Sequence, residues 1–417
     1  MELRSIAGLE VQGFNRNEEE SRFFVVLTGV YIFTWYLQLG SRISILDTIR
    51  FEFLLGLFLS IVSLFRLMTG RMAATPLRAP VVTWIVLLGL YTLFSIDVNK
   101  SWDVFFNRVI KFSMMALFIS VFVKTKFGLT VVLSAFLLAM LKLGQEGMFG
   151  WLGGGLVWQN QGIMRLHGST LMYRHPNSFS GMAVGCLPFI FYLFPVVNNI
   201  RRLILLGLLC SCLVIIVFTG SRTGYVATVF LAAYFWRDQI RKSFGKAVLV
   251  LALVILTVPF VMPEQYKERF HSIFTMEEAE GASASTRLEI LEDAWAVFLE
   301  NPMGVGVSAF PTVRMEMFGR FQDTHNLYLE ILTNTSIFGA LAFGFWLLRI
   351  VSLNRKVISE SDDELIKAIA KATIAFVYAR LFLGAFGMDA YEIYWWFATG
   401  LTVAVYKIAS GNRNQLS

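Results

Sequence analysis

The stretch IVFTGSRTGYVATVFLAAY, residues 216–234, places a single arginine, Arg222, between two apolar runs. A charge in the middle of a bilayer costs about 3 kcal/mol or more, so an arginine without support is not expected there. Arg222 therefore marks a membrane surface or has an anionic partner, and we expect both. The glycines at 220 and 224 permit a tight turn whose free N–H groups form an anion-binding nest. The alternative is an arginine that only snorkels to lipid headgroups.

Composition identifies the chain as an integral membrane protein. It has 417 residues, of which 56% are hydrophobic and only 16% are charged, and its mean hydropathy is +0.63. Soluble domains carry about 25% charged residues. The three cysteines lie in apolar stretches and form no metal-ligand pattern.

Apolar runs long enough to cross a bilayer recur along the chain. They predict an all-α polytopic membrane protein with about twelve transmembrane helices and both termini on one side. The expected helices cover residues 23–40, 51–68, 80–96, 104–123, 127–144, 177–197, 202–219, 223–236, 246–262, 327–350, 368–385 and 391–409. The expected division is a leader at 1–22, helices one to nine at 23–262, a large outer loop with short amphipathic helices at 263–324, helices ten to twelve at 325–409 and a tail at 410–417.

Basic residues assign the two sides of the membrane. The positive-inside rule places the connections rich in lysine and arginine in the cytoplasm, together with the leader and the tail. The opposite side has fewer basic residues, many of them arginines: Arg42, Arg50, Arg165, Arg174, Arg222, Arg269, Arg287, Arg314 and Arg320. These run against the rule, and arginine is suited to bidentate phosphate contact. They predict an anionic ligand at the outer face.

The loop at 263–324 contains a helix-start pattern. Thr286 and Glu289 form a capping box, and apolar residues then recur at helical spacing. Arg287 would fall in the first turn, where a cation opposes the helix dipole but helps to attract an anion to the free N–H groups. The alternative is a solvated surface arginine.

The tenth expected helix opens with polar residues. Asp323 or Thr324 is expected to cap it, and Asn326 and Glu330 begin a polar stripe on an apolar helix. Such stripes face a bundle interior or a wet cavity. His325, at the membrane boundary, has the right ordinary pKa for a general base; the alternative is a hydrogen-bonded interfacial histidine.

The segment RLHGSTLMYRHPNSFSG, residues 165–181, offers a third polar group at the outer end of the sixth expected helix. It contains Arg165, His167, Arg174, His175 and Asn177. Two histidines eight residues apart with no carboxylate or cysteine nearby do not indicate a metal site. Capping and interfacial hydrogen bonding are the expected roles of His167, and His175 is left open between these roles and ligand binding.

In these four regions the chain resembles the O-antigen ligase and O-antigen polymerase superfamily of bacterial membrane glycosyltransferases. The resemblance rests on RLHGSTLMYRHPNSFSG, TGSRTGYVA at 219–227, STRLEILEDAWAVFLENPMGVGVSAF at 285–310 and THNLYLEILTNTSIFG at 324–339. It covers about residues 160–345, whereas the first five expected helices match only in being hydrophobic. The chain departs from the family in having Asn334 and Ser336 where an acidic residue and a glycine often follow the histidine.

The resemblance implies a GT-C-like fold and transfer of a glycan from an undecaprenyl-pyrophosphate carrier at the periplasmic face of the inner membrane. It implies inversion at the anomeric carbon, no metal, no cofactor and no nucleic acid. For a ligase, which we favour over a polymerase, the acceptor is lipid A–core in lipopolysaccharide biosynthesis. The compact plan with one large loop favours the ligase. The catalytic residues implied are His325, Arg222 and Arg287. The expected substrate-binding residues are Arg165, Arg174, His175, Asn177, Ser221, Asn326 and Glu330.

A transporter of an anionic lipid-linked substrate is the competing class. It would also need arginines, but along a path through the membrane. Arg108, Lys111 and Arg380 lie in or beside expected helices and keep this alternative open.

Overall fold

The computed structural model describes residues 20–69, 75–160, 162–240, 263–275 and 283–416. This part of the chain is almost entirely helical, apart from one β-hairpin. The longer helices are α1 (Arg22–Leu37), α4 (Phe51–Met68), α5 (Arg78–Leu93), α7 (Lys111–Phe122), α8 (Lys126–Leu152), α9 (Pro176–Leu193), α10 (Asn199–Phe218), α11 (Arg222–Ile240), α13 (Glu264–Thr275), α14 (Ser283–Glu300), α15 (Phe310–Phe318), α16 (Leu327–Glu360), α17 (Glu364–Gly384) and α18 (Ile393–Leu416). The short elements are α2 (Leu39–Arg42), α3 (Ser44–Thr48), α6 (Val98–Val104), the π-helical turn Phe105–Ile110, the 3-10 turn Leu171–Tyr173, and the paired strands β1 (Val157–Asn160) and β2 (Ile163–Leu166).

Each expected membrane helix within the described residues coincides with a helix of the structure. The helix α4 has the expected bounds, whereas α16 continues ten residues beyond the expected 327–350. The ninth expected helix, 246–262, lies outside the described residues. Among those residues, five helical segments are long and apolar enough to cross a membrane: Phe51–Met68, Val98–Phe122, Lys126–Leu152, Asn199–Phe218 and Leu327–Glu360. With shorter apolar helices such as α1 and α5, they make the chain a polytopic, all-α membrane protein.

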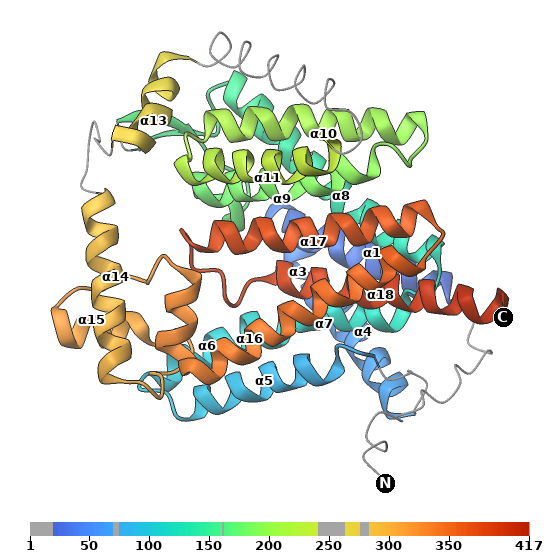
Figure 1. Cartoon of the computed structure of the whole chain (residues 1–417), viewed down its shortest axis with the longest axis horizontal. Helices are drawn as coiled ribbons and strands as arrows, with labels where there is room; N and C mark the ends of the chain where they lie inside the picture. Colours follow the sequence, from blue (N-terminus) through green and yellow to red (C-terminus); the bar gives the residue numbers. More distant parts are fainter. Residues whose placement is uncertain (1–19, 70–74, 161, 241–262, 276–282, 417) are drawn as a thin grey trace.

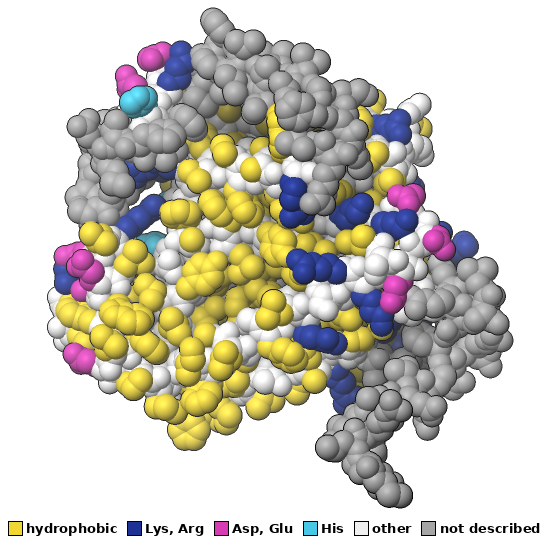
Figure 2. Space-filling model, viewed as in Figure 1, with side chains coloured by type: hydrophobic (Ala, Val, Ile, Leu, Met, Phe, Trp, Pro, Cys, Tyr) yellow, Lys and Arg dark blue, Asp and Glu magenta, His cyan; other side chains and the backbone are white. Residues whose placement is uncertain are grey.

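The long helices run roughly side by side, and α13, α14 and α15 lie at one end of them (Figure 1). The helix α9 packs against α17 and α10, α18 packs against α7, and α16 packs against α17 and α5. Hydrophobic side chains cover the middle of the face seen in Figure 2, and most charged side chains lie toward the ends of the helices. This distribution is the one that a bilayer around the bundle requires.

The helix α16 is broken near its first third. Thr335 and Ser336 have non-helical backbone angles, and Ser336 has a φ of +57°. A break of this kind frees carbonyl groups that a membrane cannot hydrate, so the protein must provide donors for them. Ser336 Oγ is also 2.6 Å from Tyr91 Oη at the end of α5, which helps to hold the break in place.

A glycine-containing loop between α14 and α15 provides these donors. Val305 N donates to Thr333 O at 2.9 Å, and Gly306 N donates to Asn334 O at 3.0 Å. A side chain at Gly304 would place its Cβ 2.9 Å from Asn334 O, so the close approach requires glycine there. The GVG sequence of the family-like motif therefore has a structural function: it joins the outer helices to the broken membrane helix.

We predict that Gly306→Ala destabilises the protein. Gly306 has a φ of +112°, and a Cβ there would lie 2.0 Å from Ser95 Oγ and 2.7 Å from Ser95 Cα. Strained backbone and overpacking should together cost about 2 kcal/mol or more. The measurement is the thermal unfolding midpoint of the detergent-purified protein. The matched control is Gly344→Ala in α16, where a Cβ meets nothing within 4 Å, and its midpoint should be unchanged or higher. Equal midpoints for the two variants would contradict the prediction.

Candidate functional site

A cavity of about 900 Å³ opens at the end of the bundle where α9 and α11 begin and α17 ends. Four arginines, two histidines and two carboxylates line it: Arg108, Arg165, Arg287, Arg380, His175, His325, Asp389 and Glu392. These residues come from seven different helices, strands and connecting segments of the chain. The cavity is therefore produced by tertiary packing, and it is large enough for a substantial ligand.

Arg165 holds one wall of the cavity. It extends from β2, and its side chain is only 2% exposed. Its Nε donates to Thr219 O at the end of α10 at 2.7 Å, and one terminal nitrogen donates to Asn177 Oδ1 on α9 at 2.7 Å. Another terminal nitrogen donates to Asn160 Oδ1 at 3.0 Å. Arg165 thus joins β2, α9 and α10 and also lines the cavity.

His175 lies immediately before α9 and caps that helix, because its Nδ1 accepts a hydrogen bond from Asn177 N at 3.2 Å. Burial lowers the pKa of His175, and the positive charges of Arg165 and Arg287 and the neighbouring His325 lower it further. The lowered pKa favours the neutral imidazole, and the capping contact leaves its second nitrogen for the cavity.

His325 lies immediately before the cap of α16, and its φ of +48° is unusual for a residue other than glycine. Such backbone strain is concentrated at functional sites. Burial lowers the pKa of His325, the Arg287 charge lowers it further, and Asp323 opposes this effect. Arg287 thus acts on both histidines, so the three side chains lie within electrostatic reach of one another.

Arg287 reaches the cavity from α14, but not from the position expected. The helix begins at Ser283, so Thr286 is already inside it and the Thr286–Glu289 capping box is wrong. Arg287 is the fifth residue of α14 and lies beyond the free N–H groups of the helix start. Thr286 instead lines the cavity beside Arg287.

Buried ion pairs hold α14 in this position. Arg314 on α15 is 1% exposed, and its Nε and one terminal nitrogen both lie 2.8 Å from Asp293 Oδ2. Arg320 also contacts Asp293, at 3.2 Å, and pairs with Glu289. Because a buried guanidinium needs a partner of opposite charge, this network restricts how α14 and α15 can pack.

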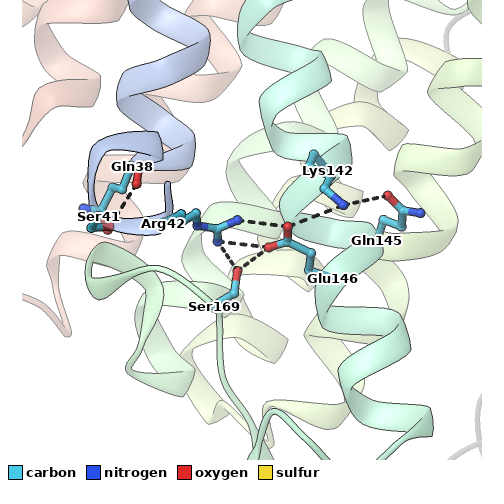
Figure 3. A network of polar contacts seen from close by, with 7 residues as sticks. All are labelled: Gln38, Ser41, Arg42, Lys142, Gln145, Glu146 and Ser169. Atoms are coloured by element: carbon cyan, nitrogen blue, oxygen red, sulfur yellow. Dashed lines mark hydrogen bonds and ion pairs between the residues drawn. The ribbon is translucent and has the colours of Figure 1, made fainter. Parts of the chain in front are cut away.

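Several arginines expected to bind an anion are therefore structural. Arg314 and Arg320 pair with carboxylates of α14. Arg42 makes a bidentate contact with Glu146 of α8, at 2.9 and 3.0 Å, and also contacts Ser169 (Figure 3). The interpretation of the outer arginines as a single anion-binding cluster is wrong for these three. Arg269 has no described side chain.

Two of the other predicted site residues, Asn326 and Glu330, do not line the cavity and have structural contacts on α16. Asn326 is the cap of the helix: its Oδ1 accepts from Tyr328 N and Leu329 N, each at 3.0 Å, which replaces the expected Asp323 or Thr324 cap. Glu330 is buried and its Oε2 accepts from Ala390 N at 3.1 Å.

Ser221, Arg222 and Arg174 also lie outside the cavity lining. Ser221 is buried, and its Oγ accepts from Gly224 N at 3.2 Å at the start of α11. Gly220 has a φ of +56°, as the predicted tight turn requires. Arg222 is the first residue of α11 and precedes Thr223, which does line the cavity. Arg174 is exposed.

Sequence reasoning missed the part of the site formed by the end of α1, by α17, and by the segment before α18 with the first turn of that helix. Trp35, Gln38, Asp389, Glu392 and Tyr394 line the cavity there. Arg380 lines the cavity too, although its position in an expected membrane helix had suggested a transport path. The available signal was an arginine inside an expected membrane helix followed by two acidic residues. Within the described residues, no group of three or more His, Cys, Asp or Glu side chains is placed to hold a metal ion.

Comparison with known proteins adds one match. Residues 205–344, about a third of the chain, match the family model described as O-antigen ligase. The match includes Arg222, Arg287 and His325, whereas Arg165, His175 and Asn177 lie before it. It confirms the resemblance to the O-antigen ligase and polymerase superfamily over this part of the chain. No curated protein matches the chain.

We predict that Asp293→Asn destabilises the outer helices. The substitution removes the close carboxylate at 2.8 Å and leaves the buried Arg314 only Glu289, at 3.9 Å, and breaking a buried pair in this way costs about 3 kcal/mol or more. The matched control is Glu289→Gln, because the Glu289 side chain is 44% exposed and its pairs should contribute about 1 kcal/mol or less. Hydrogen exchange of α14 and the thermal midpoint measure the difference. Equal protection of α14 in both variants would show that the Asp293 pair does not hold it.

Proposed function

We propose that this chain, whose residues 205–344 match the O-antigen ligase family, transfers a glycan from an undecaprenyl-pyrophosphate carrier to lipid A–core. The proposed reaction occurs at the periplasmic face of the inner membrane. The observation that carries the proposal is the convergence of Arg165, Arg287, His175 and His325 on one cavity at the end of a membrane bundle.

Charge supports a diphosphate ligand. The cavity lining contains four arginines and two carboxylates, which gives two net positive charges when the histidines are neutral. A diphosphate linking a lipid to a sugar carries about two negative charges near pH 7. Arginine suits such a group because its planar donors match phosphate oxygens.

The proposed chemistry is a direct displacement. The oxygen of an acceptor hydroxyl attacks the anomeric carbon, the bond from that carbon to the diphosphate oxygen breaks, and the electron pair stays on the diphosphate. Arg287 stabilises the negative charge that grows on this leaving group, because a fixed cation in a partly dehydrated site needs little reorganisation. Arg222 remains part of this proposal from its position beside Thr223.

His325 is the proposed general base. It accepts the proton of the acceptor hydroxyl, which requires a neutral imidazole before the reaction. The lowered pKa of His325 satisfies this requirement near pH 7. The diphosphate and the histidines then lie together, so proton removal and leaving-group departure occur in one site.

A polymerase that uses the same donor is the nearest alternative, since it differs only in the acceptor. A transporter is less well supported. Arg108 and Arg380, the residues that suggested a path through the membrane, line the same cavity as Arg165.

Transfer by the purified protein in lipid tests the proposal. With an undecaprenyl-pyrophosphate glycan, we expect product only when lipid A–core is added. Arg287→Ala, Arg222→Ala and His325→Ala should each reduce transfer by about 100-fold or more, because each removes a charge-stabilising or proton-accepting group. The control is Arg201→Ala, an exposed arginine outside the cavity. A ladder formed from donor alone would indicate a polymerase, and no product in either case would favour transport.

The pH dependence of transfer gives a second prediction. A base whose pKa is lowered stays active above that pKa, and the rate falls only as pH decreases through it. The acid limb should therefore have its midpoint below 6.5, the ordinary value for histidine. Asp323→Asn removes a charge that raises the pKa of His325, so it should move the limb to still lower pH. A limb that stays in place, or moves upward, would remove His325 from the role of base.

A further inference from the structure

Arg380 is a buried arginine that the proposed reaction leaves unused. It lies on α17, one turn before the helix ends at Gly384, and is 9% exposed. Its Nε has no hydrogen-bond partner within the described residues. Its guanidinium lies over the rings of Tyr394, at 4.1 Å from the ring centroid, and Phe376, at 5.3 Å. A buried guanidinium in this state is costly, so an anionic ligand would stabilise it strongly.

The neighbouring helix α9 leaves room for this side chain. The guanidinium lies against Gly181 and Gly185: a Cβ at Gly181 would be 3.6 Å from one terminal nitrogen, and a Cβ at Gly185 would be 2.7 Å from the other. A residue larger than glycine at position 185 would therefore displace Arg380. Both Arg380 and Gly181 line the cavity, so the glycine face of α9 directs the guanidinium toward it.

The position of Arg380 relative to Arg165 is set by α9. Arg165 contacts Asn177, and Arg380 lies against Gly181, four residues later on the same helix face. Four residues correspond to about 6 Å along a helix, so the two guanidinium groups lie at successive turns. Because α9 begins at the outer face and runs inward, Arg380 is the deeper of the two.

Arg108 also lines the cavity, but it already has a carboxylate partner. Its guanidinium lies 3.0 Å from the carboxylate of Glu392. Asp389 also lines this part of the cavity: burial raises the pKa of its carboxyl and the charge of Arg380 opposes this effect, but no ion pair joins the two side chains among the described residues. Arg380 is thus the guanidinium available to a ligand group that lies deeper than Arg165.

We infer that Arg380 binds the lipid-proximal phosphate of a lipid-linked diphosphate, while Arg165 and Arg287 bind the sugar-proximal phosphate. The lipid chain of such a ligand lies toward the membrane interior, so its first phosphate is the deeper one. This inference rests on the proposed function, because it concerns the same donor. It adds a binding residue from α17 to a site whose other proposed residues come from β2, from α14 and from the segments just before α9 and α16.

Binding to the full-length protein in nanodiscs tests the inference without requiring transfer. The probes are farnesyl diphosphate and farnesyl phosphate. The wild type should prefer the diphosphate. Arg380→Met should weaken farnesyl diphosphate binding about tenfold or more, since a hydrogen-bonded charge contact is lost, and should remove the preference over farnesyl phosphate. Arg380→Lys should lie between the two, because it keeps the charge but not the paired donors.

Two further variants separate contact from folding. Gly185→Ala keeps the arginine but displaces it, and should weaken diphosphate binding in the same direction. Arg349→Met, which removes an arginine of α16 that does not line the cavity, should leave binding within twofold of wild type. If Arg380→Met does not fold, the binding measured with Arg380→Lys and Gly185→Ala still decides the result.

Three outcomes would overturn the inference. One is an Arg380→Met variant that keeps its preference for the diphosphate. Another is inorganic pyrophosphate that binds the wild type as tightly as farnesyl diphosphate, since the site would then recognise a free anion. The third is an Arg380→Met variant that binds farnesyl diphosphate as the wild type does and loses only the binding of an acidic oligosaccharide. A different result separates the two proposals. If Arg380→Met loses the preference for the diphosphate while the wild type shows no glycan transfer, the inference is supported and the proposed reaction is contradicted.

Discussion

The insertion of the Gly304–Gly306 loop into the break of α16 is the constraint on which the outer half of the molecule depends. Two backbone N–H groups of the loop, at Val305 and Gly306, satisfy carbonyls of Thr333 and Asn334. In a bilayer these carbonyls have no water to bind, so leaving them unpaired would cost several kcal/mol. The loop and the break therefore form together. Since α14 precedes the loop and α15 follows it, both helices are attached to α16 at this point.

Asn334 extends this attachment to the other side of the cavity. Its Oδ1 accepts from Phe310 N at 3.3 Å, and its Nδ2 donates to Tyr391 Oη at 3.2 Å. One side chain thus connects the start of α15 to the segment before α18. In the sequence, Asn334 stands where the family often has an acidic residue. The structure gives it a connecting function rather than a direct contact with His325.

Arginines at the cavity end of the bundle serve two purposes, and their partners distinguish them. Arg42 and Arg314 have carboxylates within 3.0 Å, so their charges are neutralised locally and they contribute to architecture. Arg165 contacts carbonyl oxygens of a backbone and of two amide side chains, and Arg380 contacts aromatic rings. These contacts orient the two guanidinium groups at the cavity wall. Burial lowers the pKa of His175 and of His325, and the positive charges of the cavity arginines lower both further.

Hydropathy alone was sufficient to predict the helical membrane architecture, because a span must be about twenty apolar residues long and such runs are local. Local motifs likewise identified Arg287 and His325, whose residue types are unusual beside apolar helices.

Other features needed tertiary structure. Arg320 and Arg287 look alike in sequence, but only packing gives Arg320 a carboxylate partner and directs Arg287 into the cavity. Arg380 and Arg165 are more than two hundred residues apart, and they line one cavity only because α17 packs against α9. The sequence by itself determined which segments enter the membrane and which residue types are chemically capable. The tertiary structure decided which of those residues meet, because an arginine's role depends on the charge of its neighbours, and those neighbours come from distant parts of the chain.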